Sequence, residues 1–387
     1  METDILSKEG KPGIAGIEPV SVVPGGSAEL LGGQAGGVSV NAPADGISTE
    51  TAFRFAKLVH VLSGPSIIDS SFPQFPSRKD VDDFVRLCGF DTDNPLENQK
   101  LDELRVEAVG YLSEVHNLQM PEEVSAINDL RELFWTRDGT YLAAEARSYA
   151  CMLLKVMHIF YRMSARELVC NAHVSEADLF NRLSSRFFHM IDLMRAEKIN
   201  VLEYVAGKKK RYSLATKLLA KRDTLATHIF DRVRFRLVLD TRHDLVRCLE
   251  FLFGKLIPFN SVMPGQSING ILSDLDILDY LDSSTRQASD LKEAMPLKHR
   301  NAPNPQNNFS GSGYRSINFV AEIPLRIDDL VRDASPAIAV VQTEIQLLDK
   351  GTEQRNSEGS SAHYLYKRRQ TEFVRKRLLA KDHPSEI

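Results

Sequence analysis

The segment that most constrains the fold is residues 337–348, A-I-A-V-V-Q-T-E-I-Q-L-L. Its second half alternates between two sets of side chains, with Val341, Thr343, Ile345 and Leu347 in one set and Gln342, Glu344 and Gln346 in the other. Successive side chains of a β-strand point to opposite faces, so this alternation predicts a strand with one buried and one polar face. Such a strand belongs to a sheet that helices cover on its apolar side, while its polar side is left for solvent or for a site.

Two other segments predict strands of the same sheet. Residues 315–323 carry Ser316, Asn318 and Glu322 on a polar face, and residues 228–240, H-I-F-D-R-V-R-F-R-L-V-L-D, alternate arginines with apolar residues. Helical periodicity flanks them over residues 213–222, 242–254 and 360–380, and a long irregular region covers residues 257–313. This order of α, β, α, loop, β, β and α predicts an α+β domain with a mixed sheet backed by helices.

The rest of the chain is expected to divide into three parts. Residues 1–50 are rich in glycine, serine, alanine and proline and contain no aromatic residue, which predicts a disordered arm. Residues 51–199 show helical periodicity with few β-branched runs and predict an all-helical N-terminal lobe. The α+β domain then spans residues 200–381, and residues 382–387 form a tail.

Several classes of protein are disfavoured by composition. The first ten residues lack the basic-then-apolar order of a secretory signal, and the most apolar long stretch, residues 149–160, is interrupted by Lys155 and His158. The four cysteines are widely spaced, which argues against a disulfide framework or a zinc site. We therefore expect a cytoplasmic protein that does not span a membrane.

Positive charge is concentrated in two places, although the net charge is −4. Residues 207–222 hold seven basic residues and no acidic one, and residues 367–381 hold seven basic residues with Glu372 as the one acidic residue. Basic side chains gathered against an acidic background indicate local anion binding. The alternative is that both segments are solvated helix faces.

A glycine-containing turn precedes the strand at residues 315–323. The sequence N-N-F-S-G-S-G-Y-R-S-I-N-F, residues 307–319, delivers Tyr314 to the start of that strand. Glycine allows the backbone to turn there at no steric cost. Tyr314 is then either an ordinary core tyrosine or a flat aromatic platform for a nucleotide base.

Five short segments form a pattern when they are taken in order. They are K-K-K-R-Y-S-L-A-T-K at 208–217, I-F-D-R-V-R-F-R-L-V at 229–238, S-G-Y-R-S-I-N at 312–318, T-E-I-Q-L-L at 343–348 and E-G-S-S-A-H-Y-L-Y-K at 358–367. Together they resemble the synthetase domain of the RelA/SpoT family, nucleotide pyrophosphokinases that move pyrophosphate from ATP to a nucleotide 3′-hydroxyl. The resemblance implies a (p)ppGpp synthetase like the small alarmone synthetases, with a nucleotidyltransferase-like mixed sheet.

This resemblance assigns roles to single positions. Asp231 and Glu344 match the catalytic carboxylates that also bind Mg²⁺. The positions matched to ATP binding are Lys208, Lys209, Lys210, Arg211, Ser213, Lys217 and Arg236. The positions matched to acceptor binding are Tyr314, which would stack the base, with Asn318, Gln346 and His363.

The chemistry of pyrophosphate transfer calls for these residue types. Mg²⁺ prefers oxygen ligands and usually keeps waters, so one or two carboxylates suffice to hold it beside the phosphates. A neutral ribose hydroxyl is a poor nucleophile, and Glu344 is the candidate that orients it and accepts its proton. Strict alternation places Asp231 on the face of Val233 and Phe235, opposite Arg236. A strand start or a β-bulge at Asp231 is therefore needed if the two serve one site.

The sequence also departs from the family on the acceptor side. Gln266, Ile268, Asn269 and Ser310 stand where the family has residues that help to hold the acceptor, and residues 271–308 are an insertion. Asn318 replaces a family histidine, and Leu348 replaces a family arginine. The ATP and metal side is largely kept, whereas the acceptor side is rebuilt.

The expected function is transfer of pyrophosphate from ATP to the 3′-hydroxyl of GDP or GTP. Two alternatives stay open: pyrophosphorylation of a tRNA 3′ end, and nucleotide binding by a regulator without turnover. A metal-dependent hydrolase is disfavoured because the pair His243-Asp244 falls inside a predicted helix of the synthetase region. The expected partners are thus ATP and a guanine nucleotide, with tRNA as an alternative, and an oligomer is possible.

Overall fold

The computed structural model describes residues 48–69, 74–135, 139–208, 211–220, 233–281, 313–331, 336–358 and 363–379. Nearly all of the predicted arm, most of the predicted insertion and the tail lie outside the described residues, as do Lys209, Lys210 and Asp231. The backbones of Arg211 and His363 lie in helices, but their side chains are outside the described part.

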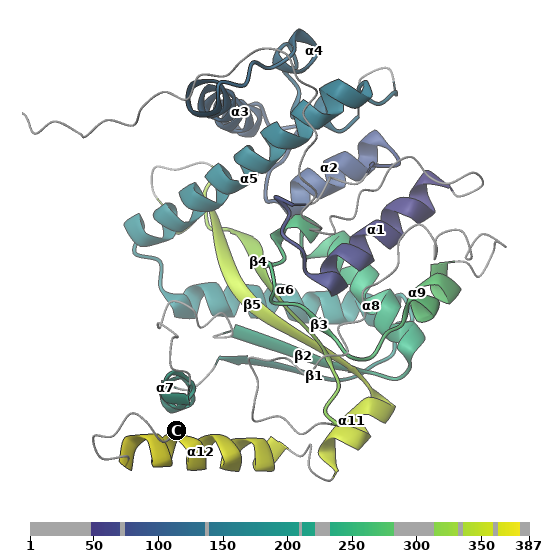
Figure 1. Cartoon of the computed structure of the whole chain (residues 1–387), viewed down its shortest axis with the longest axis vertical. Helices are drawn as coiled ribbons and strands as arrows, with labels where there is room; N and C mark the ends of the chain where they lie inside the picture. The colour runs from purple at the N-terminus through teal and green to yellow at the C-terminus, as the bar shows by residue number, and fades with distance from the viewer. Residues whose placement is uncertain are drawn as a thin grey trace, which may run out of the picture. The chain divides into compact units, whose positions relative to one another are not determined.

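A five-stranded mixed sheet forms the centre of the α+β fold (Figure 1). Its strands are β1 (Val201–Lys208), β2 (Val233–Leu239), β3 (Ile268–Asn269), β4 (Ile317–Arg326) and β5 (Ile338–Asp349). The spatial order is β1-β2-β5-β4-β3, with β2 parallel to β5 and every other neighbouring pair antiparallel. The α+β fold with a mixed, helix-backed sheet that the sequence predicts is confirmed.

Helices fill the chain before the sheet, as the periodicity predicts. They are α1 (Thr49–Ser63), α2 (Arg78–Leu87), α3 (Pro95–His116), α4 (Glu122–Ser125), the 3₁₀ helix η1 (Leu130–Leu133), α5 (Ala144–Asn171) and α6 (Glu176–Ala196). Side-chain caps define several starts: Ser48, Ser77, Asn94 and Ser175 each accept a hydrogen bond from a backbone amide of the first helical turn. These caps satisfy amides that have no partner inside the helix.

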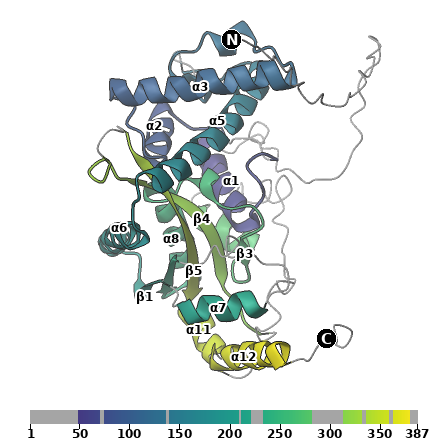
Figure 2. The ribbon, with the colours of Figure 1, turned by 90° about the vertical axis from the view of Figure 1, so that its left-hand side faces the viewer.

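The helices after α6 are α7 (Arg211–Ala220), α8 (Arg242–Lys255), the 3₁₀ helix η3 (Phe259–Ser261), α9 (Asp274–Leu281), α11 (Lys350–Ser357) and α12 (His363–Leu379). Three features correct the sequence interpretation. Residues 201–208 form the edge strand β1, the region expected to be irregular contains η3, β3 and α9, and the unpredicted α11 precedes the final helix. Figure 2 shows α7, α11 and α12 gathered at one end of the long strands.

The apolar face of the sheet packs on α6 and α8. Phe187 of α6 stacks on Phe235 of β2 with ring centroids 4.0 Å apart, and both side chains are fully buried. The same core continues into α1 and α2, where Phe55 and Val81 are also fully buried. Helices before residue 199 and strands after it thus share one core.

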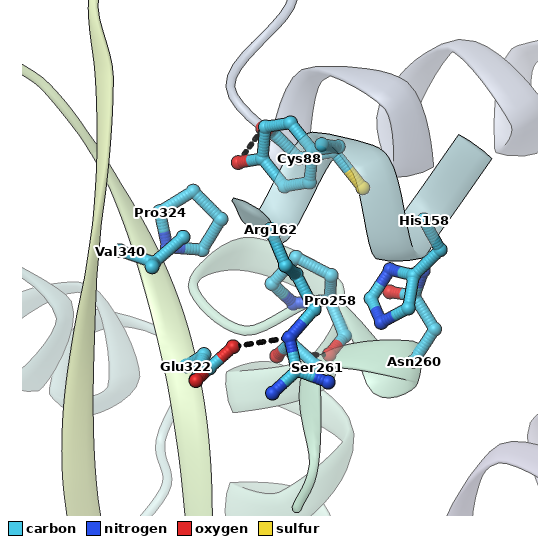
Figure 3. Close-up of a pocket in the computed structure, with 10 residues that line it drawn as sticks. Cys88, His158, Arg162, Pro258, Asn260, Ser261, Glu322, Pro324 and Val340 are labelled. Carbon is cyan, nitrogen blue, oxygen red and sulfur yellow. Dashed lines mark hydrogen bonds and ion pairs between the residues drawn. The ribbon is translucent and has the colours of Figure 1, made fainter. Parts of the chain in front are cut away.

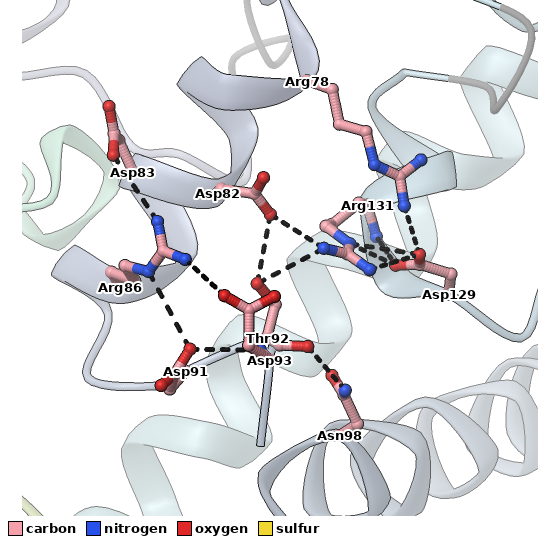
Figure 4. A network of polar contacts seen from close by, with 10 residues as sticks. All are labelled: Arg78, Asp82, Asp83, Arg86, Asp91, Thr92, Asp93, Asn98, Asp129 and Arg131. Atoms are coloured by element: carbon pink, nitrogen blue, oxygen red, sulfur yellow. Dashed lines mark hydrogen bonds and ion pairs between the residues drawn. The ribbon is translucent and has the colours of Figure 1, made fainter. Parts of the chain in front are cut away.

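A smaller core joins α3, α4, η1 and α5. Beside it, an ion network fixes α2, the α2–α3 loop and η1 to one another (Figure 4). Arg131 is its centre, with Nη1 3.1 Å from Asp82 Oδ1 and Nη2 2.8 Å from Asp129 Oδ2. Thr92 donates to Asp82 and accepts a hydrogen bond at its backbone oxygen from Asn98. None of the described helices is long and apolar enough to cross a membrane.

Candidate active site

The polar face of the sheet carries four side chains that the sequence predicts for the site and one further arginine that pairs with them. Parallel pairing of β2 with β5 sets Arg234 opposite Glu344 and Arg236 opposite Gln346. Antiparallel pairing of β4 with β5 sets Asn318 opposite Gln346. Paired residues on neighbouring strands point to the same face, so these residues form one cluster across three strands. We call Arg234, Arg236, Asn318, Glu344 and Gln346 the polar-face cluster.

Arg234 and Glu344 form the centre of the polar-face cluster. Arg234 Nε lies 3.6 Å from Glu344 Oε2, which is an ion pair but too long for a good hydrogen bond. Glu344 is only 16% exposed at its side chain and Arg234 32%. The other end of the guanidinium is fixed, because Arg234 Nη2 donates to Gln346 Oε1.

Three polar atoms of the cluster are buried without a hydrogen-bond partner among the described residues. They are Arg234 Nε, Glu344 Oε2 and Asn318 Oδ1, three of the eight such side-chain atoms in the described part of the chain. A buried polar atom left unpaired costs roughly 1–3 kcal/mol, so such atoms are uncommon without a ligand or water to satisfy them. Their gathering on adjacent strands makes this face the candidate binding site.

Tyr314 stands at the edge of the cluster and is attached to it. Gln346 Nε2 donates to the Tyr314 hydroxyl at 2.7 Å, while Gln346 itself is almost completely buried. The chain beside Tyr314 is held by α11, because Asn356 accepts a hydrogen bond from the Arg315 amide and donates to the Arg315 carbonyl. The half-buried Tyr314 is thus attached to Gln346, which Asn318 faces across the sheet, and its role in acceptor binding stays a prediction.

The described part of the chain leaves a space beside Arg234, above Gly207 of the edge strand β1. Gly207 of β1 pairs with Arg234, so a side chain at Gly207 would point to the same face. No described atom lies within 4 Å of the place where its Cβ would stand. No residue of the described part of the chain therefore blocks a ligand from approaching Arg234 on the β1 side.

Arg236 lies in the same face but is already paired with carboxylates. It forms an ion pair with Glu353 of α11, and its Nη1 lies 4.0 Å from Glu203 of β1. The sequence motif singled out Arg236, whereas it did not indicate Arg234 or Glu353. The arginines at alternate positions of β2 were visible in the sequence, but which of them faces Glu344 depends on the register of β2 against β5.

The described residues of the basic segment, predicted to bind ATP, lie at the end of β1 and on α7. Lys208 pairs with Val233, which belongs to the helix-covered face, and its Nζ lies 2.9 Å from Glu176 of α6. The structure therefore directs Lys208 away from the cluster. Ser213 and Lys217 lie on α7, which packs on α12 and accepts at Leu219 O a hydrogen bond from Arg377.

A second polar group closes the other end of the face. Glu322 of β4 is 1% exposed and forms ion pairs with Arg162 and Arg166 of α5 and a hydrogen bond with Gln342 of β5. Burial alone would raise the pKa of Glu322, but the hydrogen bond and charge of Arg162, with help from Gln342 and Arg166, hold it below its ordinary value.

Figure 3 shows Glu322 and Arg162 beside a small cavity that His158 also lines. Burial is the main cause that lowers the pKa of His158 to about 4, so its imidazole is neutral at pH 7. The charged side chains of this group, Glu322, Arg162 and Arg166, pair with one another. We therefore interpret these ion pairs as structural contacts that hold α5 on the sheet.

Comparison with known proteins gives structural neighbours but no sequence relatives. No protein-family model matches the chain, and no curated protein matches it. Among solved structures, the chain is similar to small alarmone synthetase 2 from Bacillus subtilis, with 14% identity and a TM-score of 0.28 over 53% of this chain and 91% of that one.

Two further solved structures are similar to the chain. Small alarmone synthetase 1 from Bacillus subtilis, bound to its product pppGpp, matches at 14% identity and a TM-score of 0.29 over 55% and 88% of the two chains. A GTP pyrophosphokinase family protein from Streptococcus pneumoniae matches at 12% identity and a TM-score of 0.27 over 55% and 87%. These proteins are of the class that the sequence motifs resemble. The scores are low, so the functional argument rests on this chain's own residues.

Proposed function

We propose that this chain is a nucleotide pyrophosphokinase that transfers pyrophosphate from ATP to the 3′-hydroxyl of a guanine nucleotide. The observation that carries the proposal is a group of three buried polar atoms on adjacent strands beside Tyr314 that have no hydrogen-bond partner among the described residues: Arg234 Nε, Glu344 Oε2 and Asn318 Oδ1. The order of the sequence motifs supports the same activity.

The unpartnered atoms differ in what they need from a ligand. The N–H of Arg234 Nε needs an acceptor, and a phosphate oxygen is a strong one. Glu344 Oε2 needs a cation or a hydroxyl donor, and Asn318 Oδ1 needs an N–H or O–H donor. A nucleotide supplies all three kinds of group, and its base can stack on the ring of Tyr314.

Mg²⁺ fits the donor set of the site. Glu344 Oε2 is a buried oxygen without a hydrogen-bond partner in the described part of the chain, which is the ligand type that a hard cation takes. No cluster of three or more His, Cys, Asp or Glu side chains occurs among the described residues. This suits an ion held by one or two carboxylates together with phosphate oxygens and waters. Asp231, outside the described residues, is the proposed second carboxylate. When bound, the ion neutralises charge on the phosphates.

The chain's own residues carry the proposed reaction as follows. Glu344 orients the acceptor 3′-hydroxyl and takes its proton on the carboxylate oxygen that does not hold the metal. The acceptor oxygen forms a bond to the β-phosphorus of ATP, the bond from that phosphorus to the oxygen bridging the α-phosphate breaks, and AMP leaves with the electron pair. Positive charge from Arg234 and Arg236 stabilises the charge on the transferred group.

A tRNA acceptor is the second candidate, and one observation favours it. Arg368, Arg375 and Lys376 are exposed on α12, and Tyr212 of the adjoining α7 is 87% exposed. Exposed basic residues with an aromatic side chain are typical of surfaces that follow a polynucleotide backbone. We favour a free nucleotide because the polar-face cluster and Tyr314 already match what one nucleotide needs.

An acceptor panel tests the proposal. Full-length protein is incubated with γ-³²P-ATP and Mg²⁺ and with GDP, GTP, ATP or tRNA, and the products are separated by chromatography. Label on GDP or GTP, with one AMP formed for each transfer, is the expected result. Label on tRNA alone would support the second candidate, and nucleotide binding without any transfer would favour a regulator without turnover.

A further inference from the structure

The ion pair between Arg234 and Glu344 is incomplete on both sides. Arg234 Nε and Glu344 Oε2 lie 3.6 Å apart, both are buried, and neither has a hydrogen-bond partner among the described residues. A desolvated carboxylate and guanidinium that stop short of a hydrogen bond lose solvation without the full gain of a tight pair. An ion pair of this geometry can be replaced at low cost when a ligand binds to Arg234 or to Glu344.

The neighbouring Arg236, in contrast to Arg234, lies near two carboxylates. Its guanidinium pairs with Glu353 and lies within 4.0 Å of Glu203. For Arg234, Glu344 is the carboxylate within ion-pair distance in the described part of the chain. Arg234 also borders the open space over Gly207, where a phosphate could stand.

A metal ion and Arg234 make opposing demands on Glu344. With no nucleotide, a divalent cation at Glu344 Oε2 would stand a few ångströms from a partly buried guanidinium, and like charges that close repel strongly at reduced solvation. With nucleotide present, the guanidinium has a phosphate oxygen to bind, and the carboxylate is released to the cation. Both changes are small because Gln346 holds the Nη2 end of Arg234 in place.

We propose that Arg234 is a built-in counter-ion that makes metal binding at Glu344 conditional on nucleotide. This inference rests on the proposed function, which makes Glu344 the metal-binding carboxylate. Its thermodynamic consequence is positive coupling: nucleotide strengthens the binding of the metal, and the metal strengthens the binding of nucleotide by the same factor. Arg234 is therefore a residue that couples two ligands, in addition to its contact with the phosphates.

Binding of Mn²⁺ tests the coupling without any turnover. The free Mn²⁺ signal in electron paramagnetic resonance is followed during titration of full-length protein, with and without α,β-methylene-ATP, whose α,β bond cannot be cleaved. Without nucleotide, Arg234→Gln should bind Mn²⁺ about 10-fold more tightly than wild type, a size typical of coupled sites. The increase that the nucleotide analogue produces in wild type should be correspondingly smaller in the variant.

Two matched variants decide the cause. Arg234→Lys keeps the positive charge and should bind Mn²⁺ as weakly as wild type, whereas Arg234→Gln/Glu344→Gln should lose the gain. Thermal unfolding of each variant verifies folding. The proposal is overturned if Arg234→Gln binds Mn²⁺ no more tightly than wild type, if the lysine variant behaves like the glutamine variant, or if the gain persists without Glu344. Wild-type label transfer is scored separately, so loss of the coupling and failure of the proposed function are distinguishable.

Discussion

Gln346 Nε2 donates a 2.7 Å hydrogen bond to the hydroxyl of Tyr314, which joins the C-terminal part of β5 to the chain just before β4. The same Gln346 accepts a hydrogen bond from Arg234 at its other amide atom. One buried amide therefore sets the position of the candidate base platform relative to the Arg234–Glu344 pair. Substitutions of Tyr314 should therefore affect both the stacking of the base and the hydrogen bond with Gln346.

Tyr314→Ala should weaken acceptor binding by about 1–3 kcal/mol, the range measured for base stacking on aromatic side chains. Tyr314→Phe keeps the ring but loses the bond to Gln346, so it should lower the free energy of unfolding by about 0.5–1.5 kcal/mol and change acceptor binding little. Calorimetric titration of GDP or GTP in the presence of α,β-methylene-ATP measures acceptor binding, and urea unfolding measures stability. An alanine variant that binds the acceptor normally would return Tyr314 to the role of a core residue.

Gly207→Val should block the space beside Arg234. Gly207 lies in an edge strand where a β-branched residue is well tolerated, so stability should not fall. ATP affinity should fall by at least ~10-fold if phosphate occupies that space, since overfilling a fitted site costs of order 1–3 kcal/mol. Gly207→Ala is the matched control with a smaller expected loss. Unchanged ATP binding in the valine variant would place the phosphates elsewhere.

Glu322→Gln should destabilise the fold by about 3 kcal/mol at pH 7, because it leaves the partly buried Arg162 without its counter-ion. The pKa of Glu322 is lowered in the folded chain, so its contribution to stability is complete above its ordinary pKa of 4.5 and is lost as the pH falls below that value. Urea unfolding at pH 7 and at pH 4 should show the difference between wild type and variant shrinking at the lower pH. A difference that does not change with pH would mean that the glutamate charge is not what stabilises the contact.

The exposed pair Arg375 and Lys376 separates the two candidate acceptors. Arg377 is left intact because it donates to Leu219 O and holds α12 on α7. Arg375→Ala/Lys376→Ala should keep most of the transfer to GDP or GTP. Transfer to tRNA, if it occurs, should fall sharply in this variant and decline steeply with added salt, since phosphate contacts release counter-ions. Loss of GDP or GTP turnover would instead place α12 in the nucleotide site.

The face of each strand residue could be predicted from the sequence, but the neighbours across strands could not. Alternation in β5 placed Glu344 and Gln346 on one polar face, and the structure agrees. Which arginine of β2 meets Glu344 is set by the parallel register, and no local pattern encodes that register. The position of Lys208 could not be predicted either, because the motif that contains it does not reveal that Lys208 is the last residue of a strand.

Two of the unpredicted elements, β1 and α11, have physical reasons of their own. The edge strand β1, V-L-E-Y-V-A-G-K, is mostly exposed and lacks the clean alternation of a half-buried strand. The short helix α11 is polar and begins directly at the end of β5, where Asp349 caps it. Its Glu353 and Asn356 reach Arg236 and Arg315, contacts that only the folded chain brings together.

The most direct test of the central claim compares Glu344→Gln with Glu353→Gln in the transfer of ³²P from γ-labelled ATP to GDP or GTP. Both variants remove one carboxylate from the same end of the sheet, but Glu353 pairs with Arg236 and has no proposed part in the chemistry. If Glu344 activates the acceptor hydroxyl, Glu344→Gln should lower turnover by at least ~100-fold with an unchanged thermal unfolding temperature. Glu353→Gln should lose less than about 10-fold, the most that a partly exposed ion pair usually contributes. Near-normal turnover in Glu344→Gln, or no transfer by the wild-type chain, would contradict the account.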